Sequence, residues 1–392
     1  MGFQRQIRDG LEEMRAAGLL RTPVRVLGPQ GPEIRIEGRQ VLCLCSNNYL
    51  GLASHPAIVA AARAAVVRDG VGSGASRLVT GTMDAHGAAE AAFSEFLGAP
   101  AAVLFASGYD ANVGTIQALV GPGDAVFSDA LNHASLIDGC RLSRAEVYIY
   151  EHRDVAHLES LLQAHRSRAR RALIVTDSLF SMDGVIAPVR ELASLAQAFE
   201  AGLLVDEAHA LGIIGPGGRG VAAAEQVSPD VVVGTLGKSF GAAGAFVAGS
   251  ETLVALIRNR ARSFVFSTAP PPMVARAAVA ALDLVQNADD ERRMLLGHAQ
   301  RLRSELRALG YRVPEGQSQI IPVVVGGNEQ TMQLSRALFE RGVFVQGIRP
   351  PTVPEGTARL RVTPMATHLP EHIERAIAAF AAVARAHGEL GR

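Results

Sequence analysis

The sequence LLVDEAH, residues 203–209, contains a short apolar run that ends in the carboxylate of Asp206. Unbroken apolar runs of this length are typical of strands that are buried on both faces of a sheet. In open α/β sheets, ligands bind outside the carboxyl ends of such strands. The segment therefore predicts a buried strand whose last residue, Asp206, lies at a binding site.

Similar apolar runs occur on both sides of this one along the chain, and helical patterns separate most of them. Regular alternation of strands and helices predicts an α/β layer with a largely parallel central sheet flanked by helices. The other predicted strands of this layer are Ala101–Ala106, Ala125–Ser128, Val147–Tyr150, Leu173–Thr176, Val231–Gly234 and Ala245–Ala248.

The two ends of the chain have different patterns. A helical stripe and a strand-like run at residues 41–45 precede the α/β region, and long helices with short strands at 320–325 and 359–363 follow the prolines at 270–272. A chain of 392 residues is also longer than one core usually supports. We therefore predict three parts: an N-terminal helix and strand segment (residues 1–46), a large domain (47–285) and a smaller α+β domain (286–392).

The composition excludes several classes of protein. Basic and acidic residues balance at 38 each, so the chain lacks the positive charge of a nucleic-acid-binding protein. The apolar stretches are too short for a membrane span, and no secretory signal is visible. The cysteines Cys43 and Cys45 have no second pair of ligands to complete a metal site. We expect a cytoplasmic protein that binds no metal, nucleic acid or membrane.

Three motifs resemble nucleotide-binding loops in their letters alone. The glycines of GPGGRG (215–220) have dinucleotide-loop spacing, but they do not directly follow a strand. The tripeptide GKS (237–239) ends like a phosphate-binding loop, but Val232 stands where that loop requires glycine. The helicase-like letters of residues 206–209 require the same missing loop. We therefore predict no nucleotide site.

Three other features occur at predicted strand ends. Gly108 opens a helix directly after a strand, and helix N-termini bind anions. Asp206 ends a second strand, and Lys238 follows Thr235 at the end of a third. Pyridoxal phosphate needs a phosphate site, a carboxylate for its ring nitrogen and a lysine for its aldehyde. Taken alone, these residues are equally compatible with Asp206 as a cap and Lys238 as a surface residue.

Longer motifs favour the cofactor. The sequence resembles the α-oxoamine synthase family of fold type I pyridoxal-phosphate enzymes, from Arg21 to about Ala382. The resemblance implies the fold of a fold type I transferase and a homodimer with sites at its interface. The matching motifs are SNNYLGL (46–52), GSGASR (72–77), SGYDAN (107–112), NHAS (132–135), FSMDG (180–184), DEAH (206–209) and TLGK (235–238).

The resemblance also implies roles toward the cofactor. Lys238 would bind pyridoxal phosphate as a Schiff base and then act as the base at the substrate's α-carbon. Asp206 would pair with the pyridine nitrogen, and His133 would stack on the ring, so these three are the implied catalytic residues. The other implied contacts are Ser181 and His209 at the phenolic oxygen, Gly108, Tyr109 and Thr235 at the phosphate, and Ser267 and Thr268 at the phosphate bound by a partner subunit.

The run GIRPPTVPEGTARLR (347–361) discriminates between family members. It is most similar to members that condense L-alanine with a pimeloyl thioester, with loss of CO2, in biotin biosynthesis. The implied substrate contacts are Arg21, Asn47, His133, Arg349 and Thr352. Arg349 would bind the amino-acid carboxylate through its bidentate fork. Arg21 would face the acyl group, although a rim salt bridge is its other interpretation.

Several alternatives stay open at this stage. The acyl carrier could be CoA or a carrier protein, and Ala210 replaces the glycine of many family members near the cofactor. Another α-oxoamine synthase reaction, such as glycine C-acetyl transfer or a condensation in secondary metabolism, uses the same central motifs. A non-catalytic subunit of the same fold could dispense with Lys238, so the presence of Lys238 favours an enzyme.

Overall fold

The computed structural model describes residues 2–386, and the chain divides into two compact units. Unit 2 comprises Leu50–Ser181 and Val185–Arg292. Unit 1 comprises the described residues up to Tyr49, the short segment Met182–Gly184 and the described residues from Arg293 on. The predicted domain boundaries at residues 46/47 and 285/286 stay a prediction.

A seven-stranded sheet forms the centre of unit 2. Only β10 runs in the direction opposite to the other six strands, so the predicted mostly parallel sheet is confirmed. The edge strand β6 differs from the expectation of burial on both faces, because Ile149 is exposed there. The strands, in spatial order, are β4 (Ala101–Phe105), β10 (Ala245–Gly249), β9 (Val231–Thr235), β8 (Gly202–Asp206), β7 (Ala172–Asp177), β5 (Ala125–Asp129) and β6 (Glu146–Tyr150).

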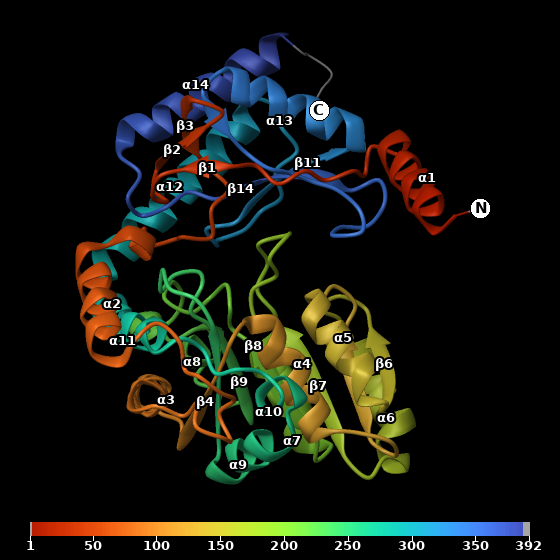
Figure 1. Ribbon diagram of the computed structural model, residues 1–392. Coiled ribbons are helices and arrows are strands. Elements are labelled where there is room, and N and C mark those ends of the chain that lie inside the picture. The colour runs from red at the N-terminus through yellow and green to blue at the C-terminus, as the bar shows by residue number, and fades with distance from the viewer. Residues whose placement is uncertain (1, 387–392) are drawn as a thin grey trace. The chain divides into compact units, whose positions relative to one another are not determined.

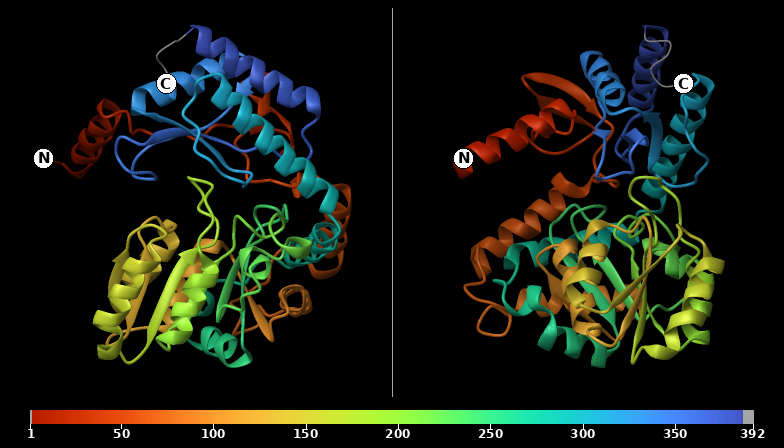
Figure 2. Two further views of the ribbon diagram at one scale, coloured as in Figure 1. Left: turned by 180° about the vertical axis from the view of Figure 1, so that it is seen from behind. Right: turned by 90° about the vertical axis from the view of Figure 1, so that its right-hand side faces the viewer.

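Helices flank this sheet, as Figures 1 and 2 show. On one face, Phe93 of α3 stacks on Phe246 of β10 with ring centroids 4.5 Å apart. On the other, Ile116 of α4 and Leu136 of α5 share a buried cluster with the strands. The helices of unit 2 are α2 (Pro56–Asp69), α3 (Asp84–Leu97), α4 (Gly108–Leu119), α5 (Ala134–Ser143), α6 (Val155–His165), α7 (Val189–Ala198), α8 (Val221–Ala224), α9 (Glu251–Arg260), α10 (Arg262–Val265) and α11 (Pro272–Gln286).

Unit 1 contains two smaller sheets and a core of its own, built from residues such as Leu42, Leu302 and Phe380. The first sheet has the order β1 (Val26–Leu27), β2 (Glu33–Ile36), β3 (Arg39–Cys43), β12 (Val343–Phe344), and the second the order β11 (Ile321–Gly326), β14 (Ala358–Val362), β13 (Gly347–Ile348). The helices are α1 (Phe3–Ala16), the part of α12 (Asp289–Ala308) from Arg293 on, α13 (Asn328–Glu340) and α14 (Pro370–Ala386).

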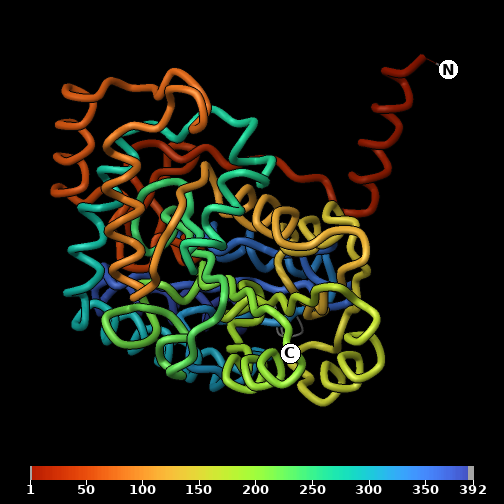
Figure 3. The backbone as a smooth tube through the Cα atoms, turned by 90° about the horizontal axis from the view of Figure 1, so that it is seen from below, coloured from red at the N-terminus to blue at the C-terminus, as the bar shows by residue number. Residues whose placement is uncertain are grey.

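Helix α1 carries the apolar stripe that the sequence predicts, but none of its residues is buried. It extends away from the other elements of unit 1 (Figure 3). Phe3 is 73 % exposed, and Ile7, Leu11 and Met14 are also exposed. Within residues 2–386, no helix has both the length and the hydropathy needed to cross a bilayer.

A buried histidine, His368, lies in unit 1 just before α14. Its Nδ1 accepts the backbone N–H of Met365 at 2.8 Å, and the backbone oxygen of His368 meets His298 Nε2 at 3.0 Å. Burial lowers the pKa of His368 to about 4, and the nearby His372 and His298 act in the same direction. In the folded chain the imidazole is therefore neutral at pH 7.

This burial makes the stability of the protein sensitive to acid. Because the pKa of His368 is lower in the folded chain than its ordinary value of 6.5, the unfolded chain takes up the proton first. We expect the free energy of unfolding to fall by roughly 3 kcal/mol through this group as the pH drops from 6.5 toward 4. His368→Asn should lessen that fall in urea titrations. His157→Asn, which also removes an Nδ1 acceptor of a backbone N–H, is the control and should leave the fall unchanged.

Candidate active site

Polar side chains end several neighbouring strands of the unit 2 sheet. Asp206 ends β8 and Thr235 ends β9, while Asp177 and Asp129 end β7 and β5. Since these strands are parallel, all four residues lie at the carboxyl edge of the sheet. The structure thus places Asp206 at the carboxyl end of a buried strand, as the sequence predicts, and ligand binding there stays a prediction.

Hydrogen bonds from the backbone and from α4 hold the Asp206 carboxylate in place. Its Oδ1 accepts the backbone N–H of Ala208 at 2.8 Å, and its Oδ2 accepts Nδ2 of Asn112 at 2.7 Å. The side chain is buried. A buried carboxylate with two donors keeps a defined orientation, which suits recognition of a ring N–H.

Lys238 and His209 come together from two strand ends. Lys238 Nζ lies 2.9 Å from His209 Nε2. The loop that carries Lys238 is fixed, because Leu236 N–H donates to Gly244 O and Ala242 N–H to Leu236 O, both at 2.9 Å. Gly241 has a φ of +62° there, and a Cβ would lie 2.4 Å from the backbone of Leu52. Only glycine therefore fits at the point where this loop turns.

The N-terminus of α4 lies beside Thr235. A Cβ added to Gly108 would be 3.8 Å from Thr235 Oγ1, so the two residues are close neighbours. Ser107 caps the helix by accepting the N–H of Asp110 at 3.1 Å. The N–H groups of the first helical turn have no acceptor within the helix, and those of Gly108 and Tyr109 suit an anion. Tyr109 itself is half exposed, and its hydroxyl donates to Asp138 at 2.6 Å.

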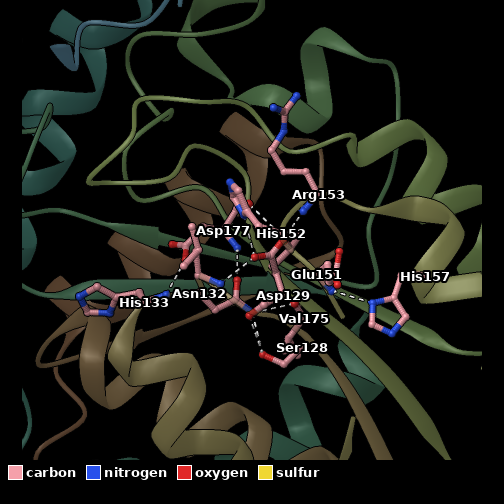
Figure 4. A network of polar contacts seen from close by, with 12 residues as sticks. Ser128, Asp129, Asn132, His133, Glu151, His152, Arg153, His157, Val175 and Asp177 are labelled. Carbon is pink, nitrogen blue, oxygen red and sulfur yellow. Dashed lines mark hydrogen bonds and ion pairs between the residues drawn. The ribbon is translucent and has the colours of Figure 1, made fainter. Parts of the chain in front are cut away.

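The backbone of His133 is fixed by a hydrogen bond to Asp177, the last residue of β7 (Figure 4). Its N–H donates to Asp177 Oδ2 at 2.7 Å, and Asn132 Oδ1 accepts the N–H of Asp177 at 2.9 Å. Burial lowers the pKa of the His133 imidazole. Burial, and then the charge of Asp206, raises the pKa of Asp177. The two hydrogen bonds connect the loop after β5 to the end of β7 beside His133.

Asp129 has a different task from Asp206, although both end strands. Its Oδ1 accepts the N–H of Leu131 at 2.8 Å and contacts His152 Nδ1 at 2.9 Å, and its Oδ2 accepts the N–H of Arg153 at 2.9 Å (Figure 4). Every one of these bonds supports the loops that follow β5 and β6. Asp129 therefore has a structural role. The sequence pattern alone could not distinguish it from Asp206, because both acids end strands.

The remaining predicted cofactor residues of unit 2 lie in loops. Ser181 follows β7 and is partly buried. Ser267 is partly buried and Thr268 is exposed, and the backbone of Thr268 forms an antiparallel bridge with Ser76. Their contacts with a cofactor stay predictions.

Three of the predicted substrate residues cluster in unit 1. Arg21 donates to the backbone oxygen of Pro350 at 2.9 Å, Arg349 donates to the backbone oxygen of Gly18, and the N–H of Thr352 donates to Arg349 O at 3.1 Å. Burial, followed by the charge of Arg21, lowers the pKa of Arg349. Two guanidinium groups near one another favour an anionic ligand.

Asn47 belongs to a second group of residues in unit 1. Its Oδ1 accepts Arg361 Nη1 at 3.0 Å and the hydroxyl of Tyr49 at 3.1 Å. Arg361 Nη2 also donates to the Tyr49 oxygen at 3.0 Å. Arg361 is not among the substrate residues that the sequence predicts, although its position in the discriminating run 347–361 could have indicated a role.

Glu207 is another residue without a predicted role. It is fully buried, and its Oε2 accepts the Ser178 hydroxyl at 2.6 Å and the N–H of Val221 at 3.0 Å. Its Oε1 accepts the N–H of Ala222 at 2.8 Å. Glu207 thus ties the β7 end and the start of α8 to the segment between Asp206 and His209. Burial raises the pKa of this carboxyl.

The chain is similar to known proteins over nearly its whole length. The family model described as aminotransferase class I and II matches residues 39–380. A serine palmitoyltransferase structure from S. paucimobilis with bound PLP aligns with a TM-score of 0.94 and 32 % identity, covering 99 % of this chain and 100 % of that one. The chain belongs to the aminotransferase class I and II family and, within it, to the α-oxoamine synthases among the fold type I enzymes.

More similar relatives carry one name. The chain is 51 % identical to the 8-amino-7-oxononanoate synthase of Geobacter sulfurreducens over 99 % of both chains. It is 51 % identical to that of Anaeromyxobacter dehalogenans over 95 % of this chain and 94 % of the relative. The solved structure of the Francisella tularensis synthase aligns with a TM-score of 0.76 and 27 % identity, over 89 % of this chain and 99 % of that one.

The cofactor of this chain is pyridoxal phosphate. The residues of unit 2 fit it, because an amine, a buried carboxylate and a helix N-terminus all occur at strand ends of one sheet edge. The amine is also chemically distinctive. Lys238 is the only lysine in the sequence, whereas arginine occurs 37 times. A guanidinium stays protonated and cannot take the part of a free amine, so Lys238 is the one side chain of the sequence that offers a primary amine.

The three bonds of Glu207 predict a measurable cost of replacement. In Glu207→Gln, either orientation of the amide turns an NH2 group toward a backbone N–H, that of Val221 or that of Ala222. We expect a loss of stability on the order of 3 kcal/mol in urea denaturation followed by circular dichroism. Glu225→Gln is the matched control, since Glu225 accepts the N–H of Arg190 in a less buried setting. Equal, small effects of the two substitutions would contradict the structural role of Glu207.

Proposed function

We infer that this chain is an acyltransferase that condenses L-alanine with a pimeloyl thioester and releases 8-amino-7-oxononanoate, CO2 and the free thiol, a step of biotin biosynthesis. The relatives of that name match the chain at about half of all positions along nearly its whole length. The structural observation that supports the inference is that the one lysine of the sequence follows β9 at the sheet edge where Asp206 ends β8, with its Nζ 2.9 Å from His209 Nε2.

We propose the following roles for the residues of unit 2. Lys238 Nζ would hold the cofactor through its aldehyde, and its free amine would serve as the base for the α-proton of alanine. The Asp206 carboxylate would pair with the pyridine nitrogen, and His133 would stack on the ring. His209 and Ser181 would hydrogen-bond to the phenolic oxygen. When bound, pyridoxal phosphate supplies an electron sink for the charge that develops at the α-carbon.

The phosphate of the cofactor needs donors. We propose that the N–H groups of Gly108 and Tyr109, with the Thr235 hydroxyl, bind it at the start of α4, where a helix N-terminus attracts an anion. In a homodimer, Ser267 and Thr268 would reach the phosphate in the partner subunit. The partly buried and exposed positions of these two residues are compatible with that role.

The residues of unit 1 suit the anionic substrates. We propose that Arg349 binds the carboxylate of alanine, that Thr352 supports it, and that Arg21 and Asn47 contact the substrates, Arg21 on the acyl side. Holding alanine by its carboxylate supplies orientation, which contributes several kcal/mol to such reactions. We also propose that the protein is cytoplasmic and that its acyl donor is a thioester of either CoA or a carrier protein.

A second candidate is a related condensation with another amino acid and acyl group. One observation favours it: the TM-score of 0.94 against a serine palmitoyltransferase exceeds the 0.76 against the Francisella synthase. Sequence identity favours the first candidate, at 51 % against 32 %. Substrate choice depends on individual side chains more than on the backbone, so identity decides between them.

The single lysine gives the cofactor proposal a direct test. After reduction with borohydride, we expect the added mass of the cofactor on one peptide, the one containing Lys238. Lys238→Arg keeps the charge but lacks the amine, and it should bind no cofactor covalently and release no thiol. Only the N-terminal amine could otherwise react. Cofactor mass on the N-terminus, or full turnover by Lys238→Arg, would refute the assignment of Lys238.

Substrate choice is tested by thiol release. We expect release from pimeloyl-CoA or a pimeloyl carrier protein with alanine, and at least tenfold slower release with glycine or serine, or with acetyl-, succinyl- or palmitoyl-CoA. Faster release from palmitoyl-CoA with serine would support the second candidate. No release from any pair by a protein that binds the cofactor would contradict both.

A further inference from the structure

Two polar side chains connect His133 to Asp206, and neither has a role in the proposed function. Asn112 of α4 donates through Nδ2 to Asp206 Oδ2 at 2.7 Å and to Ser135 Oγ at 2.8 Å. Ser135 Oγ of α5 lies 2.7 Å from His133 Nδ1. We propose that Asn112 and Ser135 are positioning residues, which orient the Asp206 carboxylate and hold His133 in the tautomer protonated at Nε2. This inference rests on the proposed function for the roles of His133 and Asp206.

The direction of each hydrogen bond follows from the chemistry of the groups. An ionised carboxylate only accepts, so Asn112 turns its NH2 group toward Asp206. The second N–H of that group goes to Ser135 Oγ, which therefore accepts it and directs its own hydrogen to His133. His133 Nδ1 also accepts the N–H of Ser135 at 3.3 Å, as the N-cap of α5. A ring nitrogen that accepts from two donors carries no proton, so the neutral imidazole carries it on Nε2.

Because these hydrogen bonds are buried, losing one of them is costly. Ser135 and Asn112 are 0 % and 1 % exposed, so water does not replace a lost partner. Among residues 2–386, Asn112 Oδ1 has no hydrogen-bond partner, which is the unfavourable side of its orientation. The amide is thus oriented by what Asp206 and Ser135 require of its NH2 group.

The charges around His133 support a neutral ring. Burial is the main cause that lowers its pKa, and Lys238 acts in the same direction, against Asp206 and Asp138. A neutral imidazole has two tautomers, and only the hydrogen bonds of one nitrogen select between them. With Nδ1 occupied by Ser135, the Nε2–H is the donor that His133 can offer to a ligand.

The tautomer can be observed without catalysis. We expect ¹⁵N spectra of histidine-labelled protein at pH 8 to show His133, identified by the signal lost in His133→Asn, with Nε2 protonated and Nδ1 bare. Ser135→Ala and Asn112→Leu should give a mixture of tautomers. A protonated Nδ1 in the parent protein would overturn the proposal, as would an unchanged tautomer in both variants. This readout does not depend on which substrates the enzyme uses.

The orientation of Asp206 is tested by cofactor affinity in two variants of similar size. Asn112→Leu removes the donor, and its dissociation constant for pyridoxal phosphate, relative to the parent, should rise at least tenfold at both pH 6 and pH 8.5. For Asn112→Asp, the dissociation constant should rise similarly at pH 8.5 but return toward the parent value at pH 6. Two adjacent carboxyl groups share a proton on acidification, and the protonated one again donates to Asp206. The charge of Asp206 acts on His133 and Asp177, Lys238 acts on the same two residues, and Asp138 acts on His133; all of these groups are present in every variant.

Two controls test whether the loss of cofactor affinity is specific to position 112. Asn259→Asp, on the exposed side of α9, should match the parent protein in cofactor affinity at both pH values. Each variant is compared only after its unfolding midpoint matches the parent within a few degrees; if Asn112→Leu does not fold, Asn112→Asp alone carries the test through its recovery at pH 6. Identical losses of both Asn112 variants at both pH values, or no loss in either, would overturn the proposal. A different substrate pair would refute the proposed function and leave this result intact.

Discussion

The burial of carboxylates at the ends of parallel strands is the constraint on which the site depends. A buried carboxylate without donors costs several kcal/mol, so each one needs a set of hydrogen bonds around it. Asp206 takes them from Asn112 and from the Ala208 backbone, and Asp177 from the N–H of His133. These bonds place the start of α5 and one turn of α4 against the sheet edge. The helix α4 that would hold the cofactor's phosphate is therefore fixed through Asn112 by Asp206, the acid that would contact the cofactor's ring.

The single lysine also distinguishes the proposed site from the rest of the chain. With 37 arginines and one lysine, the chain meets its needs for surface charge, salt bridges and carbonyl contacts almost entirely with guanidinium groups. An amine is retained only beside His209, at the end of β9. Arginines in unit 1 meanwhile serve as donors to backbone oxygens and to Asn47, around the residues that we propose for substrate binding.

Much of the fold could be predicted from the sequence, because continuous apolar runs such as 203–205 and 231–233 form strands wherever both faces of a sheet are covered. The direction of β10 was not predicted, yet the short connection from Thr235 to Ala245 has no room for a crossover helix and favours an antiparallel neighbour. The edge position of β6 left Ile149 exposed, and no local pattern distinguishes an edge strand from a central one.

For the site, the sequence by itself determined which residues have the right chemistry: the single lysine, the acid at the end of β8 and the glycine that opens α4. Each follows a strand, and parallel strands end at one edge, but the spacing alone left Asp206 as a cap and Lys238 as a surface residue equally possible until the longer motifs were considered. Only the tertiary structure showed the hydrogen bonds of Asn112, Ser135 and Glu207. Each acts through a partner from another element, with Asn112 and Asp206 94 positions apart. Hydrogen bonds between such distant segments depend on how the helices pack against the sheet, which no local pattern contains.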